Sequence, residues 1–441
     1  MLEYKFIKDN LEAVRKNIAD RYMSADADLV VALFDEKSAL LREIEELRKL
    51  RNENALKLQG MGLKQQIQKN AGVQFQAILL SQEDKGKLIA EGRQLKDKIA
   101  EMEVRFTDLE ARLALEGAKI PNMAHPEAPR GKEDKDNLEV KRVGEPTKFD
   151  FEPKDHVQLG ADLDLIDFDT ATRVSGTKFY YLKNEAVLLE MALVRYTLDI
   201  LRKKGFTLFQ TPDIARTEIL EGIGFNPRGA ESNIYTIEGE GTCLIGTAEI
   251  TLGGYYSGTI IDREKLPLKL AGVSHCFMRE AGSAGQFSKG LYRVHQFTKV
   301  EMFAYTLPED SDATHEYLRS IEEEIFSGLA IPFRVVDTCT GDLGAPAYRK
   351  WDLEAWMPGR NGGEWGEVTS TSNCTDFQAR RLNIKYKDDD GRNKYVHMLN
   401  GTAIACSRGL IAVMENFQRA DGSIAIPPAL IPYCGFSEIR R

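Results

Sequence analysis

The densest group of reactive side chains in this 441-residue chain lies in Leu270–Phe303. Two alternating apolar runs flank a loop of Gly, Ser, Ala and Lys, which is the pattern of a long antiparallel hairpin. Alternate side chains of a strand share a face. The second run, Arg293–Phe303, therefore gathers two cations, an imidazole, an aromatic ring and a carboxylate on one face: Arg293, His295, Phe297, Lys299 and Glu301. A site for a charged substrate and a solvated face with cross-strand ion pairs both fit this pattern.

Arg408 is a second candidate, because it stands between the apolar runs Ile404–Cys406 and Leu410–Val413. A cation in so apolar a helix needs a partner. A structural Asp or Glu and a nucleotide phosphate both satisfy that need, and the residue pattern leaves the two open.

Two strand-containing segments are expected near these residues. Ala345–Arg381 reads as a strand pair around a glycine turn at Asn361-Gly362-Gly363. The last segment reads as a strand at Tyr395–Leu399, a turn at Asn400-Gly401 and a helix over Thr402–Arg419.

A helix is predicted at Asn184–Lys203, ended by Gly205 and followed by a strand at Phe206–Thr211 before Pro212. Its apolar residues make one stripe: Val187, Met191, Val194, Leu198 and Leu201. An ordinary packing unit and an interface between two copies of the chain both fit.

The N-terminal part is strongly helical. Leucines repeat every seven residues at Leu33, Leu40 and Leu47, and apolar residues from Leu95 to Leu113 alternate spacings of four and three, which predicts a coiled-coil seam. Glycines separate the two halves: Gly60, Gly62, Gly72 and Gly86. We expect helices at about 29–60 and 85–117 in an antiparallel arm with a tip at 61–84, and a Pro-rich linker at 121–147. An oligomerisation coiled coil is the alternative for the arm alone.

Composition limits the class of protein. The chain contains no run of 18 apolar residues, so no membrane-spanning helix is predicted. The N-terminus resembles neither a secretory signal nor a transit peptide. Six scattered cysteines without a CxxC pair indicate reduced thiols and no structural zinc site. The net charge of −9 does not indicate nucleic-acid binding, which would need a local basic surface.

The stretch REAGSAG followed by KGLYRVHQFTKVE resembles motif 2 of class II aminoacyl-tRNA synthetases, in the form found in seryl-tRNA synthetases. Thr247-Ala248-Glu249 and the C-terminal block NGTAIACSRGLIAVMENFQRADGSIAIPPAL resemble the same family, and the likeness spans essentially the whole chain. It implies an α+β fold, with an antiparallel catalytic sheet flanked by helices at 149–441, a linker at 119–148 and a tRNA-binding coiled-coil arm at 1–118. The helix and strand at 184–211 resemble motif 1, which implies a homodimer.

The implied activity is that of a serine–tRNA ligase, with ATP, Mg²⁺, L-serine and tRNA(Ser) as reactants and cofactors. Serine would attack the α-phosphate of ATP, and the adenylate would pass to the tRNA 3′ end; positioning and charge stabilisation suffice for such chemistry. The resemblance assigns catalysis to Arg408, Glu301 and Glu280. It assigns serine binding to Thr247, Ala248, Glu249, Glu301 and Thr402. It assigns ATP binding to Arg279, Glu280, Val294, Phe297, Glu367, Val368, Thr369, Ser370 and Arg408, and Mg²⁺ to Glu367 and Ser370.

One position departs from the family pattern Cys-Phe-Arg-x-Glu. This chain reads Cys276-Phe277-Met278-Arg279-Glu280, so Met278 stands where the family has its α-phosphate Arg. Neighbours on a strand face opposite sides, so Met278 is expected to face the site and Arg279 to point away, unless a bulge shifts the register. Activity is then expected to be impaired.

Two other functions compete with ligase activity. The first is a synthetase-like paralogue that binds tRNA or a partner without charging it, which would explain Met278. The second is a ligase that charges a carrier protein, which the long arm disfavours because a carrier protein offers nothing for the arm to bind. The expected location is the cytoplasm, with a mitochondrial or plastid matrix as the alternative after removal of a targeting peptide.

Overall fold

The computed structural model describes residues 1–70, 82–226, 232–280 and 287–441, with the backbone alone for 60–70 and Gln82. The chain divides into two compact units. The smaller comprises Leu2–Ile18 and Ser24–Ile120, and the larger comprises Met1, Ala19–Met23 and Pro121–Arg441. The limits 1–118, 119–148 and 149–441 for arm, linker and catalytic domain stay a prediction.

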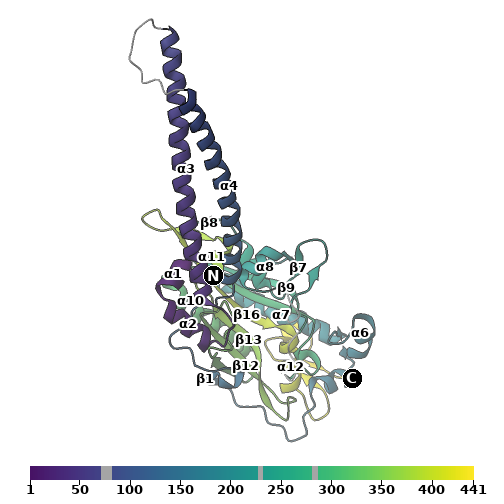
Figure 1. Cartoon of the computed structure of the whole chain (residues 1–441). Coiled ribbons are helices and arrows are strands. Elements are labelled where there is room, and N and C mark those ends of the chain that lie inside the picture. Colours follow the sequence, from purple (N-terminus) through teal and green to yellow (C-terminus); the bar gives the residue numbers. More distant parts are fainter. Residues whose placement is uncertain (71–81, 227–231, 281–286) are drawn as a thin grey trace. The chain divides into compact units, whose positions relative to one another are not determined.

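The smaller unit is built on two long antiparallel helices, α3 (Ala27–Asn70) and α4 (Gln82–Gly117), which run side by side (Figure 1). Their seam buries six of the residues that the heptad pattern selects, Leu33, Leu40, Ile44, Ile99, Leu109 and Leu113, whereas Leu47 and Leu95 are half-buried. Ion pairs Lys37–Glu110 and Arg48–Glu103 join the two helices. Two short helices, α1 (Tyr4–Asp9) and α2 (Leu11–Asp20), precede α3. The predicted antiparallel helical arm is confirmed.

The expected helix breaks at Gly60, Gly62 and Gly86 are wrong. Helix α3 continues through the first two to Asn70, and α4 already includes the third. A glycine costs a helix only about 1 kcal/mol relative to alanine, and the Leu, Lys and Gln residues around these positions are good helix formers. The predicted tip, 61–84, is therefore partly helical, while 71–81 lies outside the described residues.

The larger unit contains an extended sheet. Among the described residues its eight strands follow the order β1-β11-β12-β13-β16-β10-β9-β4, with β4 parallel to β9 and the other pairs antiparallel. The strands are β1 (Leu138–Val143), β4 (Thr207–Gln210), β9 (Leu268–Phe277), β10 (Gln296–Thr306), β11 (Phe333–Asp337), β12 (Arg349–Met357), β13 (Glu364–Asn373) and β16 (His397–Ala405). The predicted α+β fold with helices flanking an antiparallel sheet is confirmed.

Helices cover both faces of this sheet. The helices of the larger unit are α5 (His156–Asp162), α6 (Phe168–Ser175), α7 (Glu185–Lys203), α8 (Thr217–Ile223), α9 (Ala248–Gly254), α10 (Ser311–Gly328), α11 (Phe377–Leu382), α12 (Cys406–Asn416) and α13 (Ile431–Cys434). Helices α7, α9, α10, α11 and α12 contact the sheet directly. Short strands complete the unit: β2 (Ile166–Asp167), β3 (Tyr181–Leu182), β5 (Ile214–Arg216), β6 (Thr236–Ile237), β7 (Thr242–Leu244), β8 (Ile260–Ile261), β14 (Lys385–Lys387), β15 (Asn393–Tyr395), β17 (Ile424–Ala425) and β18 (Glu438–Ile439).

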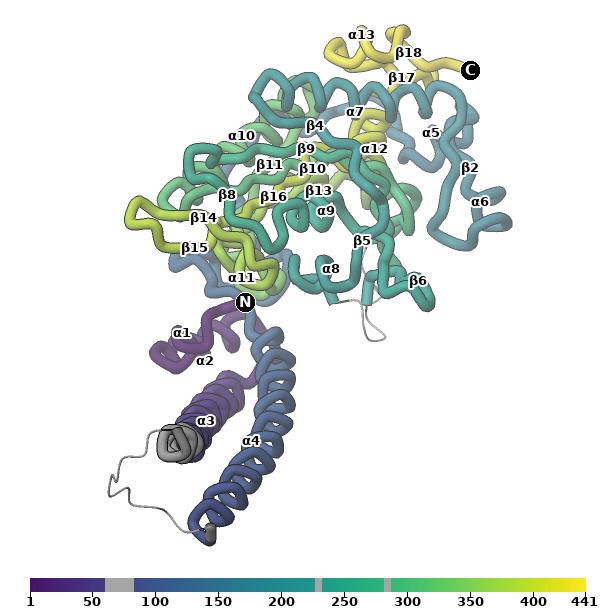
Figure 2. Tube along the Cα trace, turned by 90° about the horizontal axis from the view of Figure 1, so that it is seen from above, coloured from purple at the N-terminus to yellow at the C-terminus, as the bar shows by residue number. Residues whose placement is uncertain are grey.

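Strand β10 separates two apolar cores. Val300 and Met302 pack into a core shared with α7, α10 and α12, whereas Phe303 and Tyr305 pack into a core shared with α8 and α9. Figure 2 shows α7 and α9 on opposite sides of β9 and β10. The strand period of two thus assigns alternate residues of β10 to different environments.

The expected turn at Asn400-Gly401 is wrong, because β16 runs straight through it to Ala405. Gly401 faces a crowded part of the sheet: a Cβ there would lie 2.9 Å from Thr371 Oγ1 and 3.1 Å from Glu322 Oε1. The glycine permits a close approach within the sheet and not a turn. Thr402 is consequently a strand residue, and the helix begins only at Cys406.

Three further expectations change in detail. Strand β10 begins at Gln296 and not at Arg293, after a 3₁₀ turn, η3 (Gly290–Tyr292). The segment expected as a linker contributes β1 to the large sheet. Helix α7 buries Leu189 and Leu193, while Met191 of the predicted stripe is exposed. In the described part of the chain, none of the helices is long and apolar enough to cross a membrane.

Candidate active site

A cavity opens where the end of the β9–β10 hairpin meets β13, β16 and the first turn of α12. It is lined by Met278, Glu280, Tyr292, Arg293, Val294, Phe297, Lys299, Glu367, Val368, Thr369, Thr402, Ala405, Ser407 and Arg408. Eight of the residues predicted for the site lie in this wall, although they come from segments up to 128 positions apart: Glu280, Val294, Phe297, Glu367, Val368, Thr369, Thr402 and Arg408. The loop 281–286 between them lies outside the described residues.

Arg408 stands in the first turn of α12 and is held from two sides. Its Nη1 donates to the Glu367 backbone oxygen at 2.9 Å and lies 3.2 Å from the Glu367 carboxylate. Its Nε donates to the Tyr292 carbonyl at 3.4 Å, and the guanidinium lies 4.7 Å from the Tyr292 ring centre. Burial opposes ionisation of Glu367, but the charges of Arg408, Lys350 and Arg293 together outweigh it and lower the pKa of that carboxyl. The ion pair therefore presents both charges to the cavity.

Glu280 also lines the cavity, and it stands immediately before the loop. Its backbone adopts φ +50°, and its carboxylate accepts from Arg293 Nη1 at 2.9 Å. Phe297 follows on β10 and presents its ring to the same wall, next to buried Val294. An acceptor, an aromatic face and an adjacent backbone form a suitable cradle for a flat heteroaromatic base.

A second cluster of charge lies deeper, on β10 and β16. Lys299 Nζ is 2.6 Å from Glu301 Oε2 and 3.3 Å from the Thr402 hydroxyl, which in turn donates to Glu301 at 3.2 Å. Burial opposes the charge on Lys299, but Glu301, together with Cys276 and Glu249, outweighs it and raises the pKa of the ammonium. Glu301 and Thr402, both predicted for serine, are thus in direct contact.

Glu249 approaches this cluster from α9. Its Oε1 accepts from Gln378 Nε2 at 2.8 Å and from Asn400 Nδ2 at 3.0 Å. Burial, reinforced by the charge of Glu301, raises the pKa of Glu249 to about 7. Thr247 caps the helix by accepting from the Glu249 backbone N–H at 3.2 Å, and Ala248 is fully buried. These three predicted residues lie outside the cavity wall, and only Glu249 is coupled to it.

Met278 faces the cavity and Arg279 does not. The β9–β10 register runs from Leu268 to Phe277 without a shift, and Met278 continues it by pairing with His295. Met278 lines the cavity beside Gly246. Arg279 is exposed outside the cavity wall, and its backbone N–H donates to Asn233. Without a bulge, the strand alternation holds through this position.

Of the two residues predicted for Mg²⁺, Glu367 lines the cavity. Ser370 lies outside the cavity wall and hydrogen-bonds Asp352 on β12. Burial, reinforced by the charge of Glu367, raises the pKa of Asp352 to about 6. Among the described residues, Asp352 Oδ1 is buried without a hydrogen-bond partner, and no three His, Cys, Asp or Glu side chains form a preformed metal cluster. Carboxylate and hydroxyl oxygens beside an unsatisfied oxygen suit a hard cation.

The site also contains residues that were not predicted for it. Tyr292 and Ser407 line the cavity, Gln378 and Asn400 hold Glu249, and Asp352 holds Ser370. Tyr292 has no periodic signal, because it lies in a 3₁₀ turn. Lys299 had one, since it alternates with Phe297 and Glu301.

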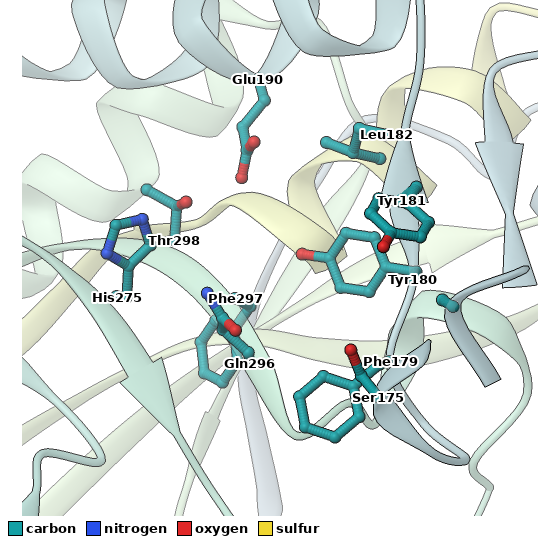
Figure 3. Close-up of a pocket in the computed structure, with 11 residues that line it drawn as sticks. Ser175, Phe179, Tyr180, Tyr181, Leu182, Glu190, His275, Gln296, Phe297 and Thr298 are labelled. Atoms are coloured by element: carbon teal, nitrogen blue, oxygen red, sulfur yellow. The ribbon is translucent and has the colours of Figure 1, made fainter. Parts of the chain in front are cut away.

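A second cavity, of about 330 Å³, lies near α7 (Figure 3). Glu190 of α7 points into it and faces Thr298 of β10 and His275 of β9. Burial raises the pKa of Glu190. Phe297 is the predicted site residue that borders this cavity as well as the first.

Comparison with known proteins agrees with this geometry. Residues 235–417 match the model of the class II tRNA synthetase core domain (G, H, P, S and T), which defines the class of the larger unit. Residues 1–124 match the seryl-tRNA synthetase N-terminal domain. The chain is 67% identical over 439 residues to a serine–tRNA ligase of Treponema denticola, covering 100% of both, and 54% identical to one of Borrelia recurrentis, covering 100% of this chain and 99% of that one.

Solved structures give the same result. A seryl-tRNA synthetase of Pyrococcus horikoshii complexed with ATP is 39% identical, with a TM-score of 0.87 and coverage of 100% of this chain and 99% of that one. A cytoplasmic serine–tRNA ligase of Naegleria fowleri in complex with AMP is 28% identical, with a TM-score of 0.82 and the same coverage. The chain belongs to the seryl-tRNA synthetase family.

Proposed function

We propose that this chain is a serine–tRNA ligase that activates L-serine with ATP and transfers it to the 3′ end of tRNA(Ser). The observation that carries the proposal is the single cavity shared by Glu280, Phe297, Glu367 and Arg408, with the Glu301–Lys299–Thr402 cluster at its inner end. A base cradle, a phosphate cation and a carboxylate for an ammonium are the groups that adenylation of an amino acid requires.

The residues divide the work along the cavity. Glu280 and Phe297 hold the adenine, and Arg408 neutralises the γ-phosphate, so that the α-phosphate lies toward the inner cluster. Glu301 accepts from the serine ammonium, and Thr402 accepts from the serine hydroxyl. Glu249 interacts with Glu301 through its charge. The serine carboxylate then attacks the α-phosphate, and pyrophosphate leaves.

The metal fits this arrangement in a supporting role. We propose that Glu367 and Ser370 hold Mg²⁺, which neutralises charge on the phosphate oxygens when it is bound. Asp352 orients the Ser370 hydroxyl, and Arg408 keeps Glu367 ionised.

The test of the proposed function is serine-dependent ATP–pyrophosphate exchange, followed by charging of tRNA(Ser) with radiolabelled serine. Alanine and glycine should support neither, because a site built to hydrogen-bond a hydroxyl strongly disfavours analogues that lack one. Exchange that is equally fast with alanine, or absent with serine, would contradict the proposal.

Replacing Glu301 should act on serine and leave ATP usage nearly unchanged. Removing one partner of a buried ion pair costs roughly 3–5 kcal/mol, so Glu301→Ala should nearly abolish exchange. Glu301→Gln keeps an acceptor for Thr402 and should raise the KM for serine about a hundredfold or more, with the KM for ATP within a few fold. Steady-state exchange with each substrate varied measures this, and a matching rise in the KM for ATP would move Glu301 out of the serine site.

The arm is proposed to bind tRNA(Ser) and to have no part in adenylation. It is a compact unit with its own buried seam, and basic residues gather toward its tip, among them Lys85, Arg93 and Lys98. Deleting 29–117 should leave pyrophosphate exchange within a few fold and abolish charging. Charging by the intact protein should also weaken as salt rises, since phosphate contacts release counterions. Equal loss of exchange and charging on deletion would contradict this role.

A homodimer is proposed through the exposed face of α7. Met191 is 62% and Leu188 47% exposed on this helix, and apolar Ile214 on β5 is 47% exposed. Exposed apolar residues on one helix favour an interface, and Glu190, which points into the second cavity, lies on the same helix (Figure 3). Light scattering should give the mass of a dimer at micromolar concentration. Met191→Glu should shift it toward monomer, whereas Ile260→Glu, an equally polar change on exposed β8, should not.

A synthetase-like protein that binds tRNA without charging it is not favoured, because the close relatives over the full length are ligases and the site carboxylates and Arg408 are present. The cytoplasmic location stays a prediction.

A further inference from the structure

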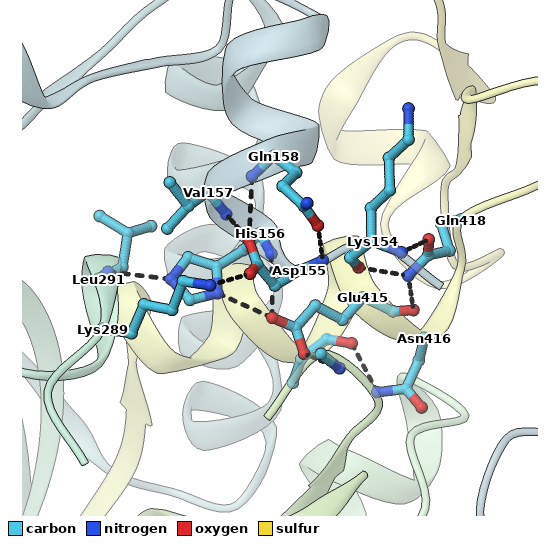
Figure 4. Close-up of polar contacts among 12 residues, drawn as sticks. Lys154, Asp155, His156, Val157, Gln158, Lys289, Leu291, Glu415, Asn416 and Gln418 are labelled. Carbon is cyan, nitrogen blue, oxygen red and sulfur yellow. Dashed lines mark hydrogen bonds and ion pairs between the residues drawn. The ribbon is translucent and has the colours of Figure 1, made fainter. Parts of the chain in front are cut away.

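A polar network outside the cavity joins three segments that are far apart in the chain (Figure 4). Asp155 caps α5 by accepting from the Val157 and Gln158 backbone N–H groups at 2.9 and 3.0 Å, and it forms an ion pair with Lys289, which precedes η3. Burial opposes ionisation of Asp155, but the contacts with Lys289 and Gln158 outweigh it and lower the pKa. The N-terminal cap of α5 is thus bound to Lys289, in the segment that leads from the motif 2 loop into η3.

His156, the first residue of α5, makes a second and buried connection. Its Nε2 accepts from the Leu291 backbone N–H at 3.1 Å, and its Nδ1 lies 2.7 Å from Glu415 Oε1. A nitrogen that accepts carries no proton, so the proton is on Nδ1 and is donated to Glu415. Glu415 Oε1 also accepts from the His156 backbone N–H at 3.0 Å, and its Oε2 from Gly359 N–H at 2.9 Å. The two ring nitrogens therefore hydrogen-bond to two different segments, Nε2 to η3 and Nδ1 to α12.

Two glycines keep these contacts tight. A Cβ on Gly290, whose φ is +57°, would lie 2.2 Å from His156 Nε2, and one on Gly359 would lie 2.9 Å from Glu415 Cδ. No side chain fits between the imidazole and the η3 backbone, so a change in the position of the ring must move η3 or α12.

Of the two segments that His156 joins, one carries Arg408 and the other is one of the two that hold its guanidinium. Leu291 is followed by Tyr292, whose carbonyl accepts from Arg408 Nε and whose ring lies against the guanidinium. Glu415 and Arg408 lie on the same helix, two turns apart. The imidazole thus sets the distance between η3, which contains Tyr292, and α12, which carries Arg408.

We propose that His156 is a positioning residue for ATP binding: it fixes the register of η3 against α12 and thereby the orientation of Arg408 and Tyr292 in the cavity. The proposal rests on the proposed function, since it takes Arg408 as a phosphate ligand. It assigns no contact with serine, so its effect falls on ATP alone.

The test compares two substitutions that each keep one end of the imidazole. His156→Gln places an acceptor near the Nε2 position and can keep the Leu291 N–H paired. His156→Asn keeps a donor near Nδ1 for Glu415 and leaves Leu291 unpaired. A misplacement of about 1 Å remote from the chemistry can cost roughly a hundredfold. In exchange assays of the full chain, His156→Asn should raise the KM for ATP about tenfold or more and leave the KM for serine unchanged, whereas His156→Gln should stay within about threefold of wild type.

The control is His315→Asn, which also removes a fully buried imidazole, here one that contacts the Thr371 carbonyl at 2.9 Å. All variants are compared by thermal unfolding with and without ATP. His156→Asn should show a smaller ATP-induced rise in Tm than wild type at the same ATP concentration, while His315→Asn should lower Tm and keep the full rise. Equal behaviour of the two Asn variants, or a His156→Asn effect on serine as large as on ATP, would overturn the proposal. A wild type without exchange would contradict the proposed function only, because the ATP-induced Tm rise still tests His156.

Discussion

Replacing Met278 by Arg should raise serine-dependent ATP–pyrophosphate exchange by about two orders of magnitude. Met278 lines the cavity with Lys299 and Arg408, at the position where the family has an Arg for the α-phosphate. One positioned donor on developing charge is typically worth about 10²–10³ in rate. The gain should appear in kcat, since the interaction strengthens as the α-phosphate is attacked. Exchange rates under saturating serine and ATP measure it directly.

Arg279→Ala is the matched control, because it alters the neighbouring residue on the opposite side of the strand. The unshifted β9–β10 register and the exposure of Arg279 predict a change within about threefold. If Arg279→Ala abolished exchange while Met278→Arg had no effect, Arg279 would supply the missing charge through a rearrangement on ATP binding. A wild-type enzyme unaffected by either change would mean that Lys299 or Arg293 already provides that charge.

The shared face of the charged residues on β10 could be predicted from the sequence, because alternation along a strand is a local pattern. Phe297, Lys299 and Glu301 lie in the part of β10 that pairs with β9 without a register shift, and a period of two puts them on one face. Arg293 and His295 lie before the start of β10, which the alternation alone did not predict: His295 Nδ1 donates to the Met278 carbonyl at 2.8 Å, and Arg293 reaches the cavity from the end of a 3₁₀ turn. Where a strand starts depends on tertiary pairing, and periodicity does not report it.

The meeting of Glu280, Glu367 and Arg408 could be predicted only through the resemblance. They lie on three segments separated by 87 and 41 positions, and no local pattern brings such segments together. His156 shows the same limit more sharply. Its partners are 135 and 259 positions away, and a single histidine opening a short helix carries no signal of either contact. The turn predicted at Gly401 was wrong for a related reason. The sequence does not distinguish a glycine that permits close packing in a sheet from a glycine that permits a turn.

Arg408→Ala should lower pyrophosphate exchange by about 10³-fold or more and raise the KM for ATP, while the KM for serine changes little. Arg408 is proposed to hold the γ-phosphate of the leaving pyrophosphate, and loss of an Arg that stabilises charge in phosphoryl transfer typically costs roughly 10³–10⁵ in rate. Arg408→Lys keeps the charge but loses the planar fork, and should fall between wild type and Ala. Arg360→Ala is the control: its guanidinium also lies 4.7 Å from the Tyr292 ring, but it lies outside the cavity wall. That variant should stay within a few fold.

A purely structural role for Arg408, as the partner of Glu367, makes a different prediction. Arg408→Ala leaves the Glu367 carboxylate without its closest cation, so Tm should fall under either role. Adding Glu367→Gln removes the unpaired charge and should restore much of that stability. For a phosphate ligand, the ATP-induced rise in Tm stays lost in the double variant; for a structural partner, it returns together with stability. Wild-type exchange in Arg408→Ala alone would remove the residue from the phosphate site.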